Sequence, residues 1–75
     1  MTQSEYAVVL VHATSHALRL EKLLLNAAIP CKLIPVPRHI SSDCGACVRI
    51  RLQDVGAVQR VVEAARLEVA SIRAI

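Results

Sequence analysis

The sequence predicts a small α+β domain in which one four-stranded antiparallel sheet is covered on one face by two helices. Three observations lead to this prediction. Four short apolar segments alternate with two segments of helical periodicity, in the order strand, helix, strand, strand, helix, strand. The chain has 75 residues, which fits a single domain over residues 1–75. About 55% of its residues are hydrophobic and only 20% are charged, which excludes a disordered chain.

The first third of the chain reads as a strand, a polar turn and a helix. The run from Tyr6 to Val11 is apolar and β-branched, as in a buried strand. The turn from His12 to His16 contains Thr14 and Ser15, which are candidates for the helix N-cap. We expect the helix to extend from Ala17 to about Ala28. Its apolar face would consist of Leu18, Leu20, Leu24, Leu25 and Ala28.

The middle of the chain reads as two strands joined by a polar loop. Cys31 to Val36 forms the second predicted strand, and Pro35 and Pro37 place it at a sheet edge because proline donates no ladder hydrogen bond. The loop runs from Arg38 to Gly45, and the third strand from Ala46 to Leu52. Alternation places Val48, Ile50 and Leu52 on one face and Cys47, Arg49 and Arg51 on the other.

The last third of the chain reads as a helix followed by a strand. Asp54 is the predicted N-cap, Val55 to Ala65 the helix, and Leu67 to Ile75 the fourth strand. This β-α-β-β-α-β order is typical of the ferredoxin-like sandwich. In that topology the turn after strand one, the 38–47 loop and the turn before strand four meet at one edge of the sheet. We therefore expect His12 and His16 near this loop, and Cys31 at the opposite edge.

Composition narrows the classes of partner and location. The net charge is only +3, and Tyr6 is the sole aromatic residue, so the stacking platform of a nucleic-acid-binding module is missing. The longest uninterrupted apolar run has six residues, which is far too short for a membrane span, and no secretion signal is visible. We expect a cytoplasmic protein with no nucleic-acid partner, no membrane partner and no cofactor. We also expect a homodimer, because the sheet face away from the helices would expose a half-apolar surface that carries Cys47, Arg49, Arg51, Ile34 and Val36.

The three cysteines, at positions 31, 44 and 47, do not suggest a disulfide framework, because their number is odd and no secretion signal precedes them. Cys44 lies on the predicted loop, where a helix N-terminus and nearby cations would favour its nucleophilic thiolate. Cys47 either resolves a disulfide or persulfide on Cys44 or is simply a small sheet residue. Cys31 is expected to be a buried small hydrophobe.

Several polar residues near the predicted loop are candidates for binding. Ser41 and Ser42 could hydrogen-bond the loop backbone or donate to an anion, and Gly45 would allow a tight turn. We expect a functional role for His12, and for His16 a turn position with satisfied hydrogen bonds. The full set of candidate binding residues is His12, Ser15, His16, Arg38, His39, Ser41, Ser42 and Gly45.

A metal centre is an alternative use of the same residues. Cys44, Cys47, His39 and one of His12 or His16 could supply four zinc ligands, but their spacing matches no zinc-finger pattern. We therefore assign no metal ligand. A metal-binding or thiol-redox module and a non-catalytic interaction or regulatory domain remain the alternatives.

The sequence resembles a family of small selenium/sulfur carrier-like domains. The matching stretches cover most of residues 6 to 52 and are Tyr6–His12, Ser15–Leu18, Glu21–Leu24, Ile29–Arg38 and Ile40–Gly45. The resemblance implies a thiol carrier in which Cys44, within Ser-Ser-Asp-Cys-Gly, holds sulfur or selenium as a persulfide or selenosulfide. It also implies a donor enzyme and an acceptor protein, and therefore a carrier rather than an independent enzyme.

Overall fold

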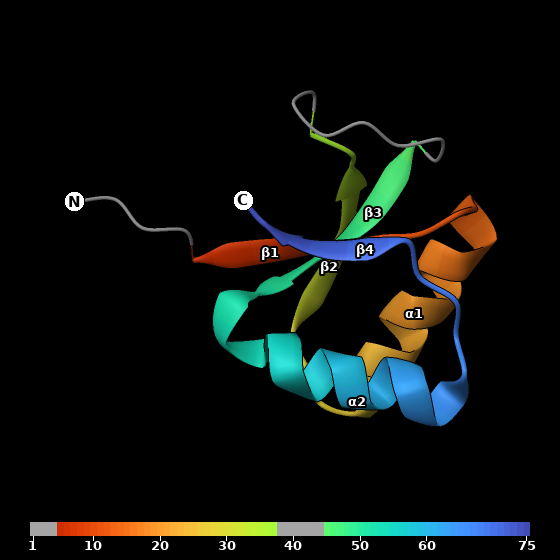
Figure 1. The fold of residues 1–75 in the computed structure, drawn as a ribbon, viewed down its shortest axis with the longest axis vertical. Coiled ribbons are helices and arrows are strands. Elements are labelled where there is room, and N and C mark those ends of the chain that lie inside the picture. Colours follow the sequence, from red (N-terminus) through yellow and green to blue (C-terminus); the bar gives the residue numbers. More distant parts are fainter. Residues whose placement is uncertain (1–4, 38–44) are drawn as a thin grey trace.

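The fold is the predicted α+β sandwich. The computed structural model describes residues 5–37 and 45–75. Its sheet has the strand order β2-β3-β1-β4, every neighbouring pair is antiparallel, and Figure 1 shows both helices on the same side of this sheet. The elements are β1 (Tyr6–Leu10), α1 (Thr14–Asn26), β2 (Cys31–Pro35), β3 (Ala46–Arg51), the 3₁₀ helix η1 (Leu52–Asp54), α2 (Val55–Ala65) and β4 (Ser71–Ala74).

The register confirms that one end of the sheet collects three connections. β1 and β2 end where β3 and β4 begin, and we call this the loop end of the sheet. The backbone N–H of Ala70 donates to the carbonyl of Leu10 at 2.7 Å, which ties the turn before β4 to the end of β1. Cys31 pairs with Ile50 at the other end of the sheet, as predicted.

The main core lies between the sheet and the helices. The helix-facing side chains of β1 and β3 are buried against α1 and α2, which confirms the predicted placement of Val48 and Ile50. Leu52 does not belong to this face, because β3 ends at Arg51 and Leu52 begins η1 with 40% of its surface exposed. The fully buried residues of this core are Ala7, Val9, Ala17, Leu20, Leu24, Val48 and Val58.

Helix α1 differs from the prediction at its start and on its apolar face. It begins at Thr14 and ends at Asn26, and its N-cap is Ala13, which makes no side-chain cap hydrogen bond. Leu18 and Leu25 are 51% and 56% exposed, although the sequence placed them on the buried face. The buried stripe is set by Ala17, Leu20 and Leu24, whose three- and four-residue spacing follows the helical period. Leu18 and Leu25 are rotated away from this stripe, as is the exposed Ala28 beyond the helix end.

Both helices end on a left-handed residue that is not glycine. Ala28 has φ 60° and Arg66 has φ 54°. After each, a buried apolar residue donates its N–H back into the helix: Ile29 to the carbonyl of Leu24 at 2.8 Å, and Leu67 to that of Val62 at 3.0 Å. This is the Schellman termination. It explains why the fourth strand starts at Ser71 and not at Leu67 as predicted, since Leu67 completes the helix cap.

Replacing Ala28 by Gly is expected to stabilise the domain by about 1 kcal/mol, because the left-handed conformation strains an L side chain and glycine adopts it freely. Chemical denaturation measures the effect. Ala27→Gly is the matched control, because Ala27 has φ −90° and should gain nothing. Equal changes in the two variants would contradict this account.

The sheet face away from the helices, which we call the open face, has its own small cluster. Val8, Leu10 and Cys47 are at most 4% exposed there, and Ile34, Val36 and Ile75 pack against them. Arg49 and Arg51 belong to this face as predicted, but Cys47 is buried in it and not exposed. The apolar side chains expected to drive dimerisation are therefore already largely covered. The described helices include none that is long and apolar enough to span a membrane.

Candidate functional site

The predicted site divides between described and undescribed parts of the chain. Cys44, Arg38, His39, Ser41 and Ser42 lie outside the described residues. The remaining candidates are described, and all of them lie toward the loop end of the sheet: His12, Ser15, His16, Gly45 and Cys47.

The hairpin formed by β2 and β3 holds the two described ends of the loop together. Pro35 pairs with Ala46, and the N–H of Val36 donates to the carbonyl of Gly45 at 3.3 Å. Gly45 is exposed, has no positive φ, and leaves open space where a Cβ would lie. The backbone at Gly45 therefore does not require glycine, and the rest of the loop in which a tight turn was expected lies outside the described residues.

Cys47 is fully buried at this hairpin. Its side chain has no exposed surface, and its Sγ lies 4.0 Å from the carbonyl oxygen of Pro35. It faces Ile34 across the β2–β3 pair and belongs to the open-face cluster. This environment matches the small sheet residue that was one of the two alternatives. Attack by the Cys47 thiol on a group in solution would require this part of the face to open.

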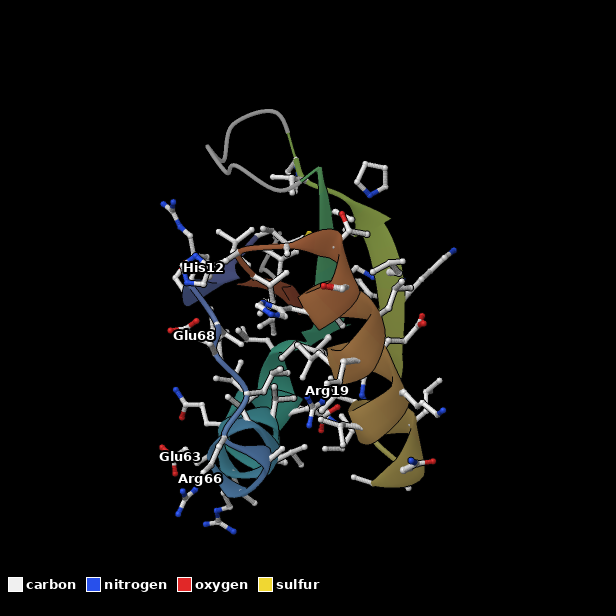
Figure 2. The ribbon with its side chains drawn as sticks, turned by 90° about the vertical axis from the view of Figure 1, so that its right-hand side faces the viewer. His12, Arg19, Glu63, Arg66 and Glu68 are labelled. Carbon is white, nitrogen blue, oxygen red and sulfur yellow. The ribbon has the colours of Figure 1, made fainter. Side chains whose placement is uncertain are left out.

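The polar residues at the start of α1 differ from one another in their exposure to solvent. His12 is exposed just after β1, and Figure 2 shows it on the same side of the molecule as Glu68. Ser15 is exposed in the first turn of the helix. His16 is half-buried, and its Nδ1 atom is buried without a hydrogen-bond partner among residues 5–37 and 45–75. The expectation of a turn position is therefore wrong for His16, which belongs to the helix, and the described part of the chain does not supply the hydrogen bond expected for Nδ1.

No metal centre is visible among residues 5–37 and 45–75, where no three His, Cys, Asp or Glu side chains are grouped to hold an ion. The four-ligand set weighed from the sequence includes Cys44 and His39, which lie outside these residues. The described part of the chain thus contributes at most Cys47 and one of His12 or His16 to such a set.

Cys31 lies at the end of the sheet opposite to the loop. Its side chain is half-buried against the main core, and its thiol donates to the carbonyl of Glu21 at 3.6 Å. Burial raises the pKa of the Cys31 thiol above its usual value of 9.0, and the negative charge of Glu21 raises it further. Cys31 is therefore a poor nucleophile at neutral pH, in keeping with the small hydrophobe predicted from the sequence.

Comparison with known proteins decides the family. The family model described as "Putative Se/S carrier protein-like" matches residues 5–73. The chain belongs to this family. The match confirms the resemblance to this family seen over residues 6 to 52. It also extends the similarity through β4, where the chain resembles the family only in general character. No curated protein and no solved structure matches the chain significantly.

In this selenium/sulfur carrier-like chain, alkylation of Cys31 by iodoacetamide should be slow at neutral pH. The raised pKa means that the folded state prefers the neutral thiol. The neutral Cys31 thiol contributes its full share to the stability of the folded state below the pKa that this thiol has in the unfolded chain. This contribution is lost as the pH rises through the pKa of Cys31 in the folded state. Peptide mass spectrometry should therefore show that Cys31 labelling rises at a higher pH in the folded chain than in the urea-unfolded chain. Equal labelling of the folded and unfolded chains at neutral pH would contradict this.

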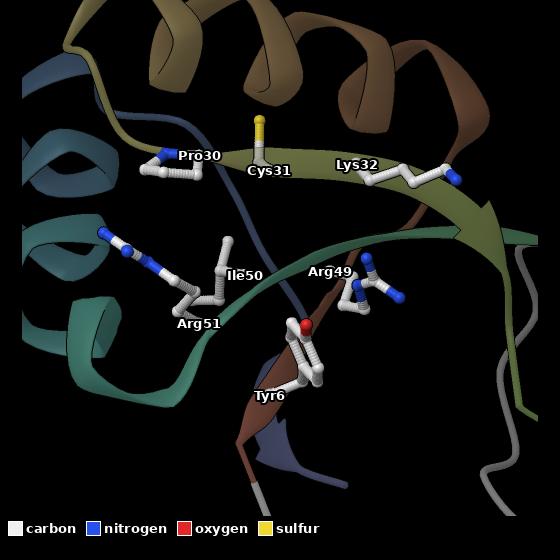
Figure 3. Close-up of a pocket in the computed structure, with 7 residues that line it drawn as sticks. All are labelled: Tyr6, Pro30, Cys31, Lys32, Arg49, Ile50 and Arg51. Carbon is white, nitrogen blue, oxygen red and sulfur yellow. The ribbon is translucent and has the colours of Figure 1, made fainter.

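The carrier-family chain also has a hollow that the sequence did not reveal. It measures about 300 Å³ and is lined by Tyr6, Lys32, Arg49 and Arg51 together with Pro30, Cys31 and Ile50. Figure 3 shows Tyr6, Lys32 and Arg49 on one side of the sheet and Cys31 directed toward the helix on the other. The guanidinium of Arg49 lies 4.4 Å from the centre of the Tyr6 ring. The alternation of residues along β3 indicates from the sequence that Arg49 and Arg51 share one face. The register of β2 against β3 is what brings Lys32 beside Arg49, and the sequence does not show it.

Proposed function

We propose that this protein carries sulfur or selenium on Cys44, as a persulfide or a selenosulfide, between a donor enzyme and an acceptor protein. The observation that carries the proposal is the carrier-family match over residues 5–73. Cys44 stands within the Ser-Ser-Asp-Cys-Gly stretch from which the resemblance assigned this role. The protein acts in the cytoplasm as a carrier and not as an independent enzyme.

The chemistry needs one thiolate and no external oxidant or reductant. The Cys44 thiolate attacks the terminal sulfur of a persulfide on the donor. A new sulfur–sulfur bond forms at Cys44, the sulfur–sulfur bond of the donor breaks, and the donor cysteine leaves as a thiolate. An acceptor thiolate then repeats the same exchange on the terminal atom held by Cys44. Transfer of selenium follows the same electron count, with a sulfur–selenium bond in place of the sulfur–sulfur bond.

The two described cysteines, Cys31 and Cys47, are poorly suited to form a persulfide, which supports the assignment of this role to Cys44. Cys47 has no exposed surface, so a donor persulfide cannot reach it without a rearrangement. The thiol of Cys31 is half-buried, and its raised pKa keeps it protonated at neutral pH. Thiolate character and access both govern persulfide formation, and each of these cysteines lacks at least one of them.

The test is loading by a sulfur donor. The reduced protein is incubated with a cysteine desulfurase and cysteine, and the intact and peptide masses are then measured without a reducing agent. We expect a mass increase of one sulfur atom, located on the peptide that contains Cys44. Equal loading of the Cys31 peptide, or no loading of any peptide, would refute the carrier function. Light scattering on the same sample checks the predicted homodimer.

A further inference from the structure

A row of cations crosses the open face of the sheet. The register aligns Lys32 with Arg49 across β2 and β3, Arg49 with Val8 across β3 and β1, and Val8 with Arg73 across β1 and β4. Arg51 lies two positions farther along β3 and therefore on the same face. Neighbouring strands are about 4.8 Å apart, so this row is as long as the sheet is wide. We call Lys32, Arg49, Arg51 and Arg73 the cation row.

Most carboxylates lie away from this row, and Glu5 is an exception that lines a hollow together with Tyr6 and Arg51. Among the described residues, Asp54 is the only acidic side chain paired with a member of it, through a bond of 2.9 Å to Arg51. Glu21 and Glu63 belong to the two helices, and Glu68 follows α2, as Figure 2 shows for the last two. Four of the eight described basic residues are in the cation row, and the other four are on the helices or directly after α2, where acidic residues accompany them. Among the described residues, Lys32, Arg49 and Arg73 thus have no carboxylate partner, whereas Arg51 is already paired with Asp54.

Repulsion within the cation row destabilises the sheet. Lys32 and Arg49 are directly opposite on an antiparallel pair, and like charges in that position destabilise a sheet. Arg49 is held in place by the Tyr6 ring beneath its guanidinium. A hollow of about 300 Å³ lies among Tyr6, Lys32, Arg49 and Arg51, and it can accept a carboxylate side chain between Lys32 and Arg49, since Arg51 is already paired with Asp54. An anionic partner would relieve this repulsion.

We propose that the open face docks an acidic surface of a partner protein, whose carboxylates pair with the cation row. A second copy of the chain does not fit on this face, because two identical cationic faces repel each other, so the homodimer expected from the sequence would have to form through another surface. A nucleic acid fits less well, because Tyr6 is the only aromatic residue and one face of its ring is taken by Arg49. The inference rests on the proposed function only for the role of the partner as sulfur donor or acceptor.

The test compares two double variants of equal charge. Lys32→Gln/Arg73→Gln removes two cations from the row, and Lys22→Gln/Arg60→Gln removes two exposed cations from the helices. Isothermal titration at low salt measures binding of poly-L-glutamate as the carboxylate probe and of polyuridine as the nucleic-acid probe. We expect the open-face variant to bind poly-L-glutamate about tenfold more weakly than wild type, while the helix variant stays near wild type. The melting temperature of the open-face variant should be unchanged or higher.

Three results would overturn the inference: no binding of poly-L-glutamate, equal weakening in both variants, or preferential binding of polyuridine that depends on the cation row. Loading of sulfur from inorganic polysulfide gives an independent readout, because no protein partner takes part in it. The open-face variant should load Cys44 from polysulfide like wild type. Failure of wild type to load would therefore count against the carrier function, whereas the poly-L-glutamate result concerns the docking face alone.

Discussion

A Cys44→Ser variant should take up no sulfur from a desulfurase, whereas Cys31→Ala and Cys47→Ala variants should load to about the wild-type extent. The serine hydroxyl cannot replace the thiolate as nucleophile at neutral pH. Cys31 is at the opposite end of the sheet with a raised thiol pKa, and Cys47 has no exposed surface. Mass spectrometry of the three variants under the same loading conditions measures the effect. Loading of Cys44→Ser would contradict the assignment.

The Cys47→Ala variant also separates the two alternatives for Cys47. If Cys47 resolves the persulfide, its thiolate attacks the inner sulfur of Cys44. A disulfide then forms between the two cysteines, and hydrosulfide leaves with the terminal sulfur. Cys47→Ala would prolong the life of the persulfide in that case. If Cys47 is only a buried sheet residue, as its environment indicates, the decay of the persulfide should be the same in the variant and in wild type.

A Leu24→Ala variant should lose about 2–5 kcal/mol of unfolding free energy, since it leaves a cavity in the main core. A domain of this size has a total stability on the order of 4–11 kcal/mol, so a large part of it would be lost. Leu24 has no exposed surface and packs between the helices and the sheet. Urea unfolding followed by circular dichroism measures the loss.

Leu25→Ala is the matched control on the same helix. Leu25 is the next residue and is 56% exposed, so its truncation should change stability by no more than about 0.5 kcal/mol. The sequence alone assigned both leucines to one apolar face. Equal losses in the two variants would mean that Leu25 is covered in solution, for example by a second copy of the chain. That outcome would contradict the exposure described for Leu25.

The order and type of the elements were predictable because their signals are local. The β-branched run at the N-terminus and the alternation around Val48 and Ile50 need no tertiary information. The bounds of α2 were predicted correctly, but the end of α1 was less predictable, because Ala28 adopts a left-handed conformation without the glycine that usually marks such a position. The N-cap of α1 was missed for a similar reason, since Ala13 occupies it without a capping side chain.

The candidate site was predictable in its chemistry but not in its environment. The three cysteines and the meeting of connections at the loop end follow from sequence and topology. The burial of Cys47 depends on Leu10 and Ile34, which come from other strands. No local pattern in the sequence predicts this burial. The burial of His16 Nδ1 within the first turn of α1, with no hydrogen-bond partner among the described residues, likewise has no local signal in the sequence.

The order of four strands and two helices follows from the amino-acid sequence alone, and the same sequence is the basis for proposing Cys44 as the sulfur-carrying residue. Periodicity and residue chemistry are local properties, so one chain read in order contains them. The position of the basic residues relative to one another, in contrast, requires the folded sheet. Lys32, Arg49 and Arg73 are far apart along the chain, and pairing of β2, β3, β1 and β4 in one register brings them into a single row. Strand register depends on how the whole hydrophobic face packs, which is why the cation row emerges only in the folded sheet.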